Sequence, residues 1–438
     1  MNATRARPED LRARARSERF AASLWPLPTI FGFVALVIAV LLVVIDDQLH
    51  IQGGGDRLLV ADPDTALALT SVVATGMLAF LGIVFATTLV AIQLAASQYS
   101  PRAVRVFVRS RLTKVSLGVF VATFVFSLVT LIAIRTADAA DAGFTPVLST
   151  GGLTVLVIAT LVAFLVFANG TAQLLRVQYL IERIARDTRP GLEVAFPSRA
   201  EVVDVALPDG TLIDEAIGSL RRGVLDAVDV GGLAALAEQV DGWIEMTVPV
   251  GSYVPHGGTI AIVHRGANPS PVTAADLAAR VDACLLFTNE RTLLQDPGFG
   301  FRQLVDIASR ALSPAVNDPT TAVQVVDRLT DLLGQIVNRN DPSGWFSGVS
   351  NIARVHLELD DLRGLTTLAF TEVIRYGVDS PQVVRRLHSA FDQLDARAAS
   401  AGRVGIEEMR RLLAAATDES APSAFLEISA VPDPRGLG

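Results

Sequence analysis

The chain has 438 residues, with 37 basic and 45 acidic side chains and a formal net charge of −8. Hydrophobic residues make up 51% of it, and its mean hydropathy of +0.44 is high for a soluble protein. The only cysteine, Cys284, excludes an internal disulfide and a thiolate metal cage. The only lysine, Lys114, lies far from any glycine-rich loop, which excludes a Walker-type phosphate site.

Four uncharged, apolar segments occur early in the chain, at residues 27–45, 66–96, 115–134 and 147–168. A helix needs about 20 apolar residues to cross about 30 Å of hydrocarbon. The alternative is four buried helices of a soluble core, but core helices of this length normally show a polar face. The sequence therefore predicts four transmembrane helices and the lipid bilayer as a partner.

Basic residues are distributed unevenly among the connections of these segments. Six arginines precede the first span, five basic residues lie between the second and third, and four arginines follow the fourth. The other two connections carry two basic and seven acidic residues. Basic residues are retained on the cytoplasmic side of a membrane. We therefore expect both termini in the cytoplasm.

The second span is long, and small or polar residues recur along one of its faces. A helix over its 31 uncharged residues would extend about 46 Å, which is more than the bilayer core. Small residues on one face let helices approach closely in lipid. Two interpretations are open: packing inside a single four-helix bundle, or lining a pore in a homo-oligomer. The stripe consists of Ser71, Thr75, Ala79, Gly82, Ala86 and Gln93.

The remainder, residues 191–438, carries 20 basic and 33 acidic residues, which argues against nucleic acid as a partner. Strand-like patterns occur at 221–230, 243–250 and 259–264, with a short helix at 232–239. The segment VPVGSYVPHGGTIAIV, residues 248–263, is similar to half of a lipoyl- or biotinyl-type barrel module. Such modules carry a lysine that becomes modified, and none is present here. We predict a small β-barrel-like module without a carrier function.

After Thr273 the pattern becomes helical. Helices are expected at about 273–286, 299–312, 319–336, 349–359, 361–376, 380–400 and 404–416. The fourth span is expected to continue as helix to about Arg186 and to end at Pro190 and Gly191. The predicted fold is thus an α-helical membrane domain with a cytoplasmic α+β domain, in which the β-barrel-like module precedes a helical subdomain. Its parts are an arginine-rich tail (1–23), the membrane domain (24–190), the β-rich module (191–270), the helical subdomain (271–417) and a mobile tail (418–438).

The densest group of polar residues in this half lies at 295–321. Arg302 and Asp306 are spaced for an i,i+4 ion pair, and Asp318 followed by Pro319 is a strong helix-start signal. One interpretation is a capped helix–turn–helix with an internal ion pair. The other is a binding site in which two neighbouring helix N-termini hold an anion or a nucleotide phosphate. The candidate residues are Gln295, Asp296, Arg302, Asp306, Ser313, Asn317, Asp318 and Thr320.

No arrangement of residues indicates an enzyme. The five histidines do not have metal-site spacing, and no Gly-x-Ser-x-Gly motif is present. Cys284 lies in an apolar run, as expected of a buried structural cysteine. We therefore expect no catalytic residues, no metal and no cofactor.

Three stretches resemble a bacterial family of uncharacterised predicted membrane proteins, domain of unknown function number 2254. They are IVFATTLVAIQLAASQYSPRAVRVFVRS (83–110), GSYVPHGGTIAIV (251–263) and RTLLQDPGFGFRQLVDIASRALSPAVNDPTTAVQVVDRL (291–329). The resemblance covers roughly residues 20–400. It implies an integral protein of the bacterial inner membrane and supplies no functional residues.

Two functions are compatible with these observations. The first is a homo-oligomeric channel or passive conduit whose cytoplasmic half gates or assembles it. The absence of charged residues and histidine from the spans favours this over an ion-coupled pump or a voltage sensor. The second is a membrane-anchored binding or scaffold protein that recognises a cytoplasmic ligand or protein and does not transport.

Overall fold

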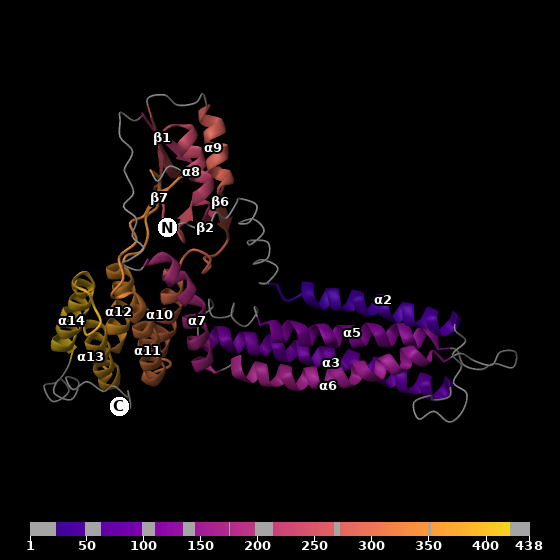
Figure 1. Cartoon of the computed structure of the whole chain (residues 1–438). Coiled ribbons are helices and arrows are strands. Elements are labelled where there is room, and N and C mark those ends of the chain that lie inside the picture. The colour runs from indigo at the N-terminus through magenta and orange to yellow at the C-terminus, as the bar shows by residue number, and fades with distance from the viewer. Residues whose placement is uncertain are drawn as a thin grey trace. The chain divides into compact units, whose positions relative to one another are not determined.

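The computed structural model describes residues 23–48, 63–98, 110–134, 145–174, 176–197, 213–266, 272–348 and 352–420 (Figure 1). It divides into two compact units, the membrane unit within Glu18–Tyr179 and the carboxy-terminal unit within Leu180–Gly438. The predicted arginine-rich tail, most of the connections between spans and the predicted mobile tail after residue 420 lie outside the described residues.

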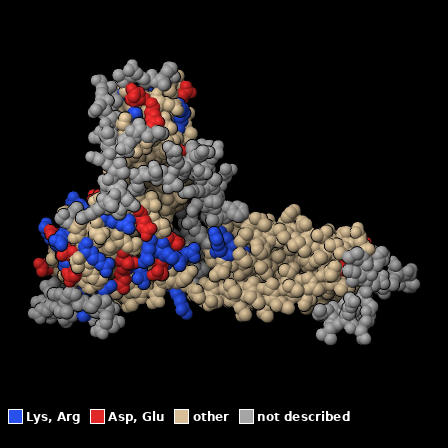
Figure 2. All heavy atoms as spheres, in the orientation of Figure 1, with Lys and Arg blue, Asp and Glu red and all other residues tan. Residues whose placement is uncertain are grey.

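Four long helices form the membrane unit, and each is long and apolar enough to cross a membrane. The four predicted spans are therefore confirmed as helices, and the protein is a multi-pass membrane protein with four candidate spans. The face seen in Figure 2 shows few charged side chains along this unit, whereas charges of both signs gather on the carboxy-terminal unit. The helices are α2 (Pro26–Gln48), α3 (Pro63–Gln98), α5 (Arg111–Ala133) and α6 (Val147–Leu174).

Helix α5 is the centre of the membrane unit. It packs against the other three helices, and half of its span is buried. On the α2 side, Gly118 leaves room for the Phe31 ring, since a Cβ at Gly118 would lie 2.8 Å from that ring. On the α6 side, the hydroxyls of Thr123 and Thr160 are 2.7 Å apart and share a hydrogen bond. Phe31 and Gly118 lie in the first halves of their helices, so α2 is parallel to α5. Phe120 of α5 contacts Phe167 near the end of α6, so α6 is antiparallel to α5, as in an up-and-down bundle.

A buried carboxylate joins the C-terminus of α2 to the N-terminus of α6. Asp46, in the last turns of α2, is fully buried. Its two oxygens accept hydrogen bonds from the backbone N–H groups of Leu148 (3.0 Å) and Ser149 (3.1 Å) in the first turn of α6. These N–H groups have no partner within their own helix, and the helix dipole favours a negative charge at this end. Asp46 of α2 therefore caps α6, although about 100 residues separate them in the sequence.

The strands of the carboxy-terminal unit form two open sheets. The five-stranded sheet has the order β1-β5-β3-β8-β7, and only the β3–β8 pair is parallel. The three-stranded sheet has the order β4-β2-β6. The strands are β1 (Ile213–Gly218), β2 (Gly223–Val228), β3 (Trp243–Met246), β4 (Tyr253–Val254), β5 (Thr259–Arg265), β6 (Leu285–Thr288), β7 (Trp345–Ser347) and β8 (Ala353–His356).

Helices α8 (Val230–Gln239) and α9 (Ala274–Ala283) pack on the strands and share one apolar core with both sheets. The described strands thus form two open sheets and not the predicted β-barrel-like module. The helix expected at 349–359 is also wrong, because β8 occupies its centre, and the helix from Thr273 ends before β6. β6 and β8 have only four residues each, too few for a periodic pattern to show, and β6 pairs with the distant β2 and β8 with the distant β3.

The remaining helices form a bundle that includes α7. Asp318 caps α11 by accepting a hydrogen bond from the Thr321 N–H (3.1 Å), as the sequence predicted. The helix expected to continue from the fourth span to Arg186 is instead two helices, and α7 passes through Pro190. Its apolar face, which includes the buried Leu180 and Leu192 on either side of Pro190, holds it together by packing. The helices are α7 (Val177–Ala195), α10 (Gly298–Ala311), α11 (Pro319–Ile336), α12 (Leu362–Gly377), α13 (Pro381–Asp395) and α14 (Ser400–Ser420).

Replacing Asp46 by Ala tests the cap between α2 and α6. We expect Asp46→Ala to lower the stability of the full chain in detergent by about 0.5–2 kcal/mol, because the first turn of α6 loses its acceptors. Thermal unfolding followed by circular dichroism measures this. Asp47→Ala is the matched control, since Asp47 is exposed. An equal loss of stability in both variants would contradict the cap.

Candidate functional site

The small-residue stripe of the second span lies on the exposed face of α3. All six of its residues are exposed, and a Cβ added at Gly82 would have no neighbouring atom within 4 Å. The opposite face of α3, which includes Met77, Leu81 and Val84, packs against Leu117 and Phe120 of α5. The stripe therefore does not pack inside the bundle of the four described helices.

The polar block at 295–321 is spread along α10 and the turn that follows it. Gln295 and Asp296 precede α10, Arg302 and Asp306 lie on it, and Asp318 caps the next helix. The Asp318 N–H donates to the Ala311 carbonyl at 2.7 Å, so α11 begins beside the end of α10. The 14 residues of α10 therefore place the two N-termini about 20 Å apart at 1.5 Å per residue. One anion cannot contact both N-termini, so the block does not form the joint anion site considered from the sequence.

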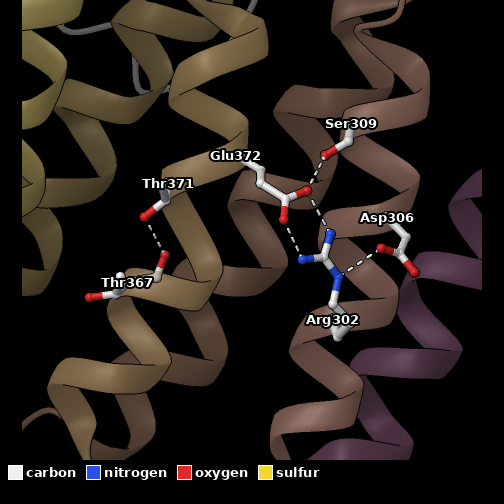
Figure 3. A network of polar contacts seen from close by, with 6 residues as sticks. All are labelled: Arg302, Asp306, Ser309, Thr367, Thr371 and Glu372. Carbon is white, nitrogen blue, oxygen red and sulfur yellow. Dashed lines mark hydrogen bonds and ion pairs between the residues drawn. The ribbon is translucent and has the colours of Figure 1, made fainter.

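The centre of α10 carries the predicted ion pair and extends it to a second helix (Figure 3). Arg302 Nε donates to Asp306 Oδ1 at 2.7 Å. Its two terminal nitrogens donate to both carboxylate oxygens of Glu372 on α12, at 2.5 and 2.7 Å, and Ser309 donates to Glu372 at 3.3 Å. A two-pronged arginine–carboxylate pair restricts orientation as well as adding attraction. Arg302 therefore sets the register of α10 against α12.

The charges of this network stabilise one another. The hydrogen bonds from Arg302 hold the pKa of Glu372 below its ordinary value, against the opposing effect of burial. The same hydrogen bonds raise the pKa of Arg302 above its usual range, so its guanidinium stays charged. Arg302 thus joins carboxylates of two helices of its own chain, which favours a structural role for Arg302 and Asp306.

A second acidic pair lies at the start of α10. Asp296 is 5% exposed; it accepts hydrogen bonds from the Phe299 N–H (2.9 Å) and Arg291 Nε (2.9 Å). Burial raises the pKa of Asp296, while the charge of Arg291 acts against that rise. Asp360 has an exposed surface, but its Oδ2 lies beside Gly298. Desolvation by burial, and to a lesser extent the charge of Asp296, raise the pKa of Asp360. One arginine thus faces two carboxyl groups at the junction of the sheets and the helical bundle.

The other candidate residues serve local structure. The Gln295 side chain accepts from the Val228 N–H (2.8 Å) and donates to the Val228 carbonyl (3.1 Å), so it binds the backbone at the end of β2. Ser313 Oγ donates to the Arg310 carbonyl at 2.7 Å. Asn317 is exposed with a φ of 48°, and Thr320 is exposed in the first turn of α11. The capped helix–turn–helix interpretation accounts for these positions.

Helix α7 is joined closely to α10 and α11 in the same unit. A Cβ at Gly300 would overlap Thr188 Oγ1, so only glycine allows this approach of α10 to α7. Ion pairs reinforce it, with Arg328 Nε 2.9 Å from Glu182 Oε2 and Arg189 paired with Asp331. In the sequence, α7 begins three residues after α6 ends.

The sequence analysis missed a row of aromatic and histidine side chains on the five-stranded sheet. Trp243 stacks on His264 at 3.8 Å between ring centroids, Trp345 lies 5.0 Å from Trp243, and His356 lies 4.7 Å from Trp345. His264 Nδ1 is 2.6 Å from Asp214 Oδ1. Only strand register brings these residues together, since Trp243 is opposite His264 and Trp345 is opposite His356. No spacing in the sequence could have indicated the row.

Within the described ranges, no three His, Cys, Asp or Glu side chains are placed to hold a metal ion. Cys284 is buried and ends α9, where its N–H donates to the Val281 carbonyl at 2.9 Å. The buried thiol therefore belongs to the packed core of the two sheets.

Residues 21–393 match the model of a family described as predicted membrane protein, domain of unknown function 2254. The chain belongs to this family. It is 28% identical over 387 residues to the uncharacterised protein Rv1290c of Mycobacterium tuberculosis and to the uncharacterised protein Mb1321c of Mycobacterium bovis. Each alignment covers 86% of this chain and 72% of the relative. No solved structure matches the chain.

Replacing Glu372 by Gln tests the α10–α12 ion pair. We expect Glu372→Gln to lower the stability of the full chain at pH 7 by about 1 kcal/mol, a small loss because the Glu372 side chain is 39% exposed and solvent screens the pair. Since folding lowers the pKa of Glu372, its contribution is complete above the ordinary glutamate pKa. It disappears as the pH falls through the lower folded value. The difference between variant and parent should therefore shrink in acid.

Thermal unfolding between pH 7 and pH 3 measures this difference. Glu407→Gln is the matched control, because Glu407 pairs with Arg411 at 3.5 Å and both side chains are largely exposed. A loss at pH 7 that is no larger than in the control, or that grows toward pH 3, would contradict the assigned role.

Proposed function

We propose that this protein is a homo-oligomeric channel or passive conduit of the bacterial inner membrane. In this proposal the exposed stripe of α3 faces other copies of the chain around a pore. The carboxy-terminal unit, beginning with α7, serves as the gating or assembly domain.

The observation that carries the proposal is the direction in which the stripe faces. Ser71, Thr75 and Gln93 place hydroxyl and amide groups on the exposed side of α3. A polar group in hydrocarbon is costly without a hydrogen-bond partner. Contact with other copies or with water in a pore removes that cost, and the small residues Ala79, Gly82 and Ala86 permit close approach.

The distribution of charge supports an orientation with both termini in the cytoplasm. Within the membrane unit, α2 and α5 begin at the end where α3 and α6 finish. Arg111 and Lys114 lie at that end, and Asp46, Asp47 and Asp64 lie at the opposite end. Basic residues favour the cytoplasmic side.

Disulfide crosslinking tests the oligomer. In a Cys284→Ser background, we expect single cysteines at Ser71, Ala79 and Ala86 to form covalent dimers of the full chain in membranes upon mild oxidation. Non-reducing gels measure the yield. Cysteines at Val37 on α2 and Leu161 on α6, which are 51% and 63% exposed, are the matched controls. They should give several-fold less dimer. Equal yields at stripe and control positions would contradict the interface.

The conduit itself requires an electrical measurement. Purified full-length protein in planar bilayers should conduct, and Gly82→Phe should lower the conductance by obstructing the stripe. If the protein crosslinks through α3 but gives no current at any ionic, voltage or tension condition, the proposed oligomer is supported and the proposed conduit is contradicted.

A further inference from the structure

A cavity of about 240 Å³ opens between three helices of the membrane unit. Its walls come from Trp25 and the first turn of α2, from residues 85–92 of α3, and from Leu117 and Val121 of α5. For comparison, an engineered cavity of about 150 Å³ lined by apolar side chains stays dry and binds benzene. The space is therefore large enough for several methylene groups.

The packing of α2 and α3 on α5 explains why this space exists. α2 lies close to α5 because each helix presents a glycine to the other. Gly32 of α2 faces Val121, and Gly118 of α5 faces Phe31. α3 packs on a different side of α5, through Phe120. Trp25 and Phe85 span the space between α2 and α3, and their rings stack with centroids 5.7 Å apart.

The chemistry of the walls selects an apolar guest. The two hydroxyls of the lining are satisfied within their own helices, since Thr88 donates to the Val84 carbonyl (2.7 Å) and Thr29 to the Trp25 carbonyl (2.8 Å). Neither hydroxyl therefore has a hydrogen left to donate to a polar ligand. Apolar surface in the described lining exceeds polar surface by far. A chain of methylene groups meets these conditions.

The depth of the cavity matches one leaflet of a bilayer. Leu117 and Val121 lie six and ten residues from the start of α5, or about 9 and 15 Å along its axis at 1.5 Å per residue. The hydrocarbon core of a bilayer is about 30 Å thick, so one leaflet is about 15 Å thick, similar to the depth of Val121. Trp25, which is 67% exposed at the start of α2, suits the membrane–water boundary.

Positive charge lies at the same end. Lys114 precedes Leu117 by three residues on the same face of α5, but it is only 6% exposed. Arg111 is exposed one turn earlier. Basic side chains next to a membrane surface attract anionic headgroups. We infer that this cavity binds an acyl chain of an anionic phospholipid, whose phosphate lies beside the exposed Arg111.

This site is distinct from the α3 stripe, because no residue of the lining belongs to the stripe. The experiment therefore does not depend on oligomerisation. Full-length protein in phosphatidylcholine nanodiscs receives a trace of phosphatidylglycerol with a photoactivatable diazirine in the middle of one acyl chain. After irradiation, mass spectrometry locates the labelled peptides.

We expect several-fold more label on the peptides that contain residues 85–92 and 117–121 than on the exposed face of α6 at residues 155–166. A phosphatidylcholine probe with the same diazirine should label these peptides less. Equal labelling of α6 would show ordinary boundary lipid only and would overturn the site. Equal labelling by the two headgroups would overturn the anionic assignment.

A variant that fills the cavity provides the second measurement. Leu89 lines the cavity and is 58% exposed, so Leu89→Trp can occupy the space without disturbing the core. We expect it to lower labelling of residues 117–121 several-fold. Leu161→Trp on the exposed face of α6 is the matched control and should leave labelling unchanged. Ile92→Phe fills the same space if Leu89→Trp fails to fold. Unchanged labelling in a folded cavity-filling variant would overturn the inference.

Discussion

The membrane unit depends on lipid as its solvent. Phe33, Val72 and Ile158 expose 60% or more of their surface, and similar side chains cover the outer faces of α2, α3 and α6. In water each exposed apolar Å² carries a cost of about 25 cal/mol, but hydrocarbon removes that cost. The bundle must then be held by close packing and hydrogen bonds, because lipid supplies no hydrophobic drive between helices. The glycine contacts of α5, the Thr123–Thr160 hydrogen bond and the Asp46 cap are interactions of this kind.

The carboxy-terminal unit is stabilised in the opposite way. Its strands and helices bury continuous apolar cores, and its polar side chains form pairs across elements. Arg302 connects α10 to α12, and Arg328 and Asp331 of α11 connect to α7. Gly300 allows α7 and α10 to approach closely. These contacts hold α7 within the carboxy-terminal unit.

Sequence reasoning succeeded where a local rule determines the outcome. The spans follow from runs of about 20 apolar residues, the α11 cap from Asp318 before Pro319, and the Arg302–Asp306 pair from i,i+4 spacing. It failed where tertiary contacts decide. Glu372 is 70 residues from Arg302, and β6 and β8 are too short to show a period. The direction of the α3 stripe could not be predicted either, because both faces of that helix are mostly uncharged and only its packing on α5 distinguishes them.

The immersion of α2, α3 and α6 in lipid is tested most directly by spin labels on their exposed faces. In a Cys284→Ser background, nitroxides at Val37, Leu78 and Ile158 report collisions with oxygen, which concentrates in lipid, and with a water-soluble nickel chelate. Val404, which is 51% exposed in the carboxy-terminal unit, is the reference position. The account predicts high oxygen and low nickel accessibility at the three membrane positions and the reverse at Val404. Nickel accessibility at the three positions as high as at Val404 would contradict it.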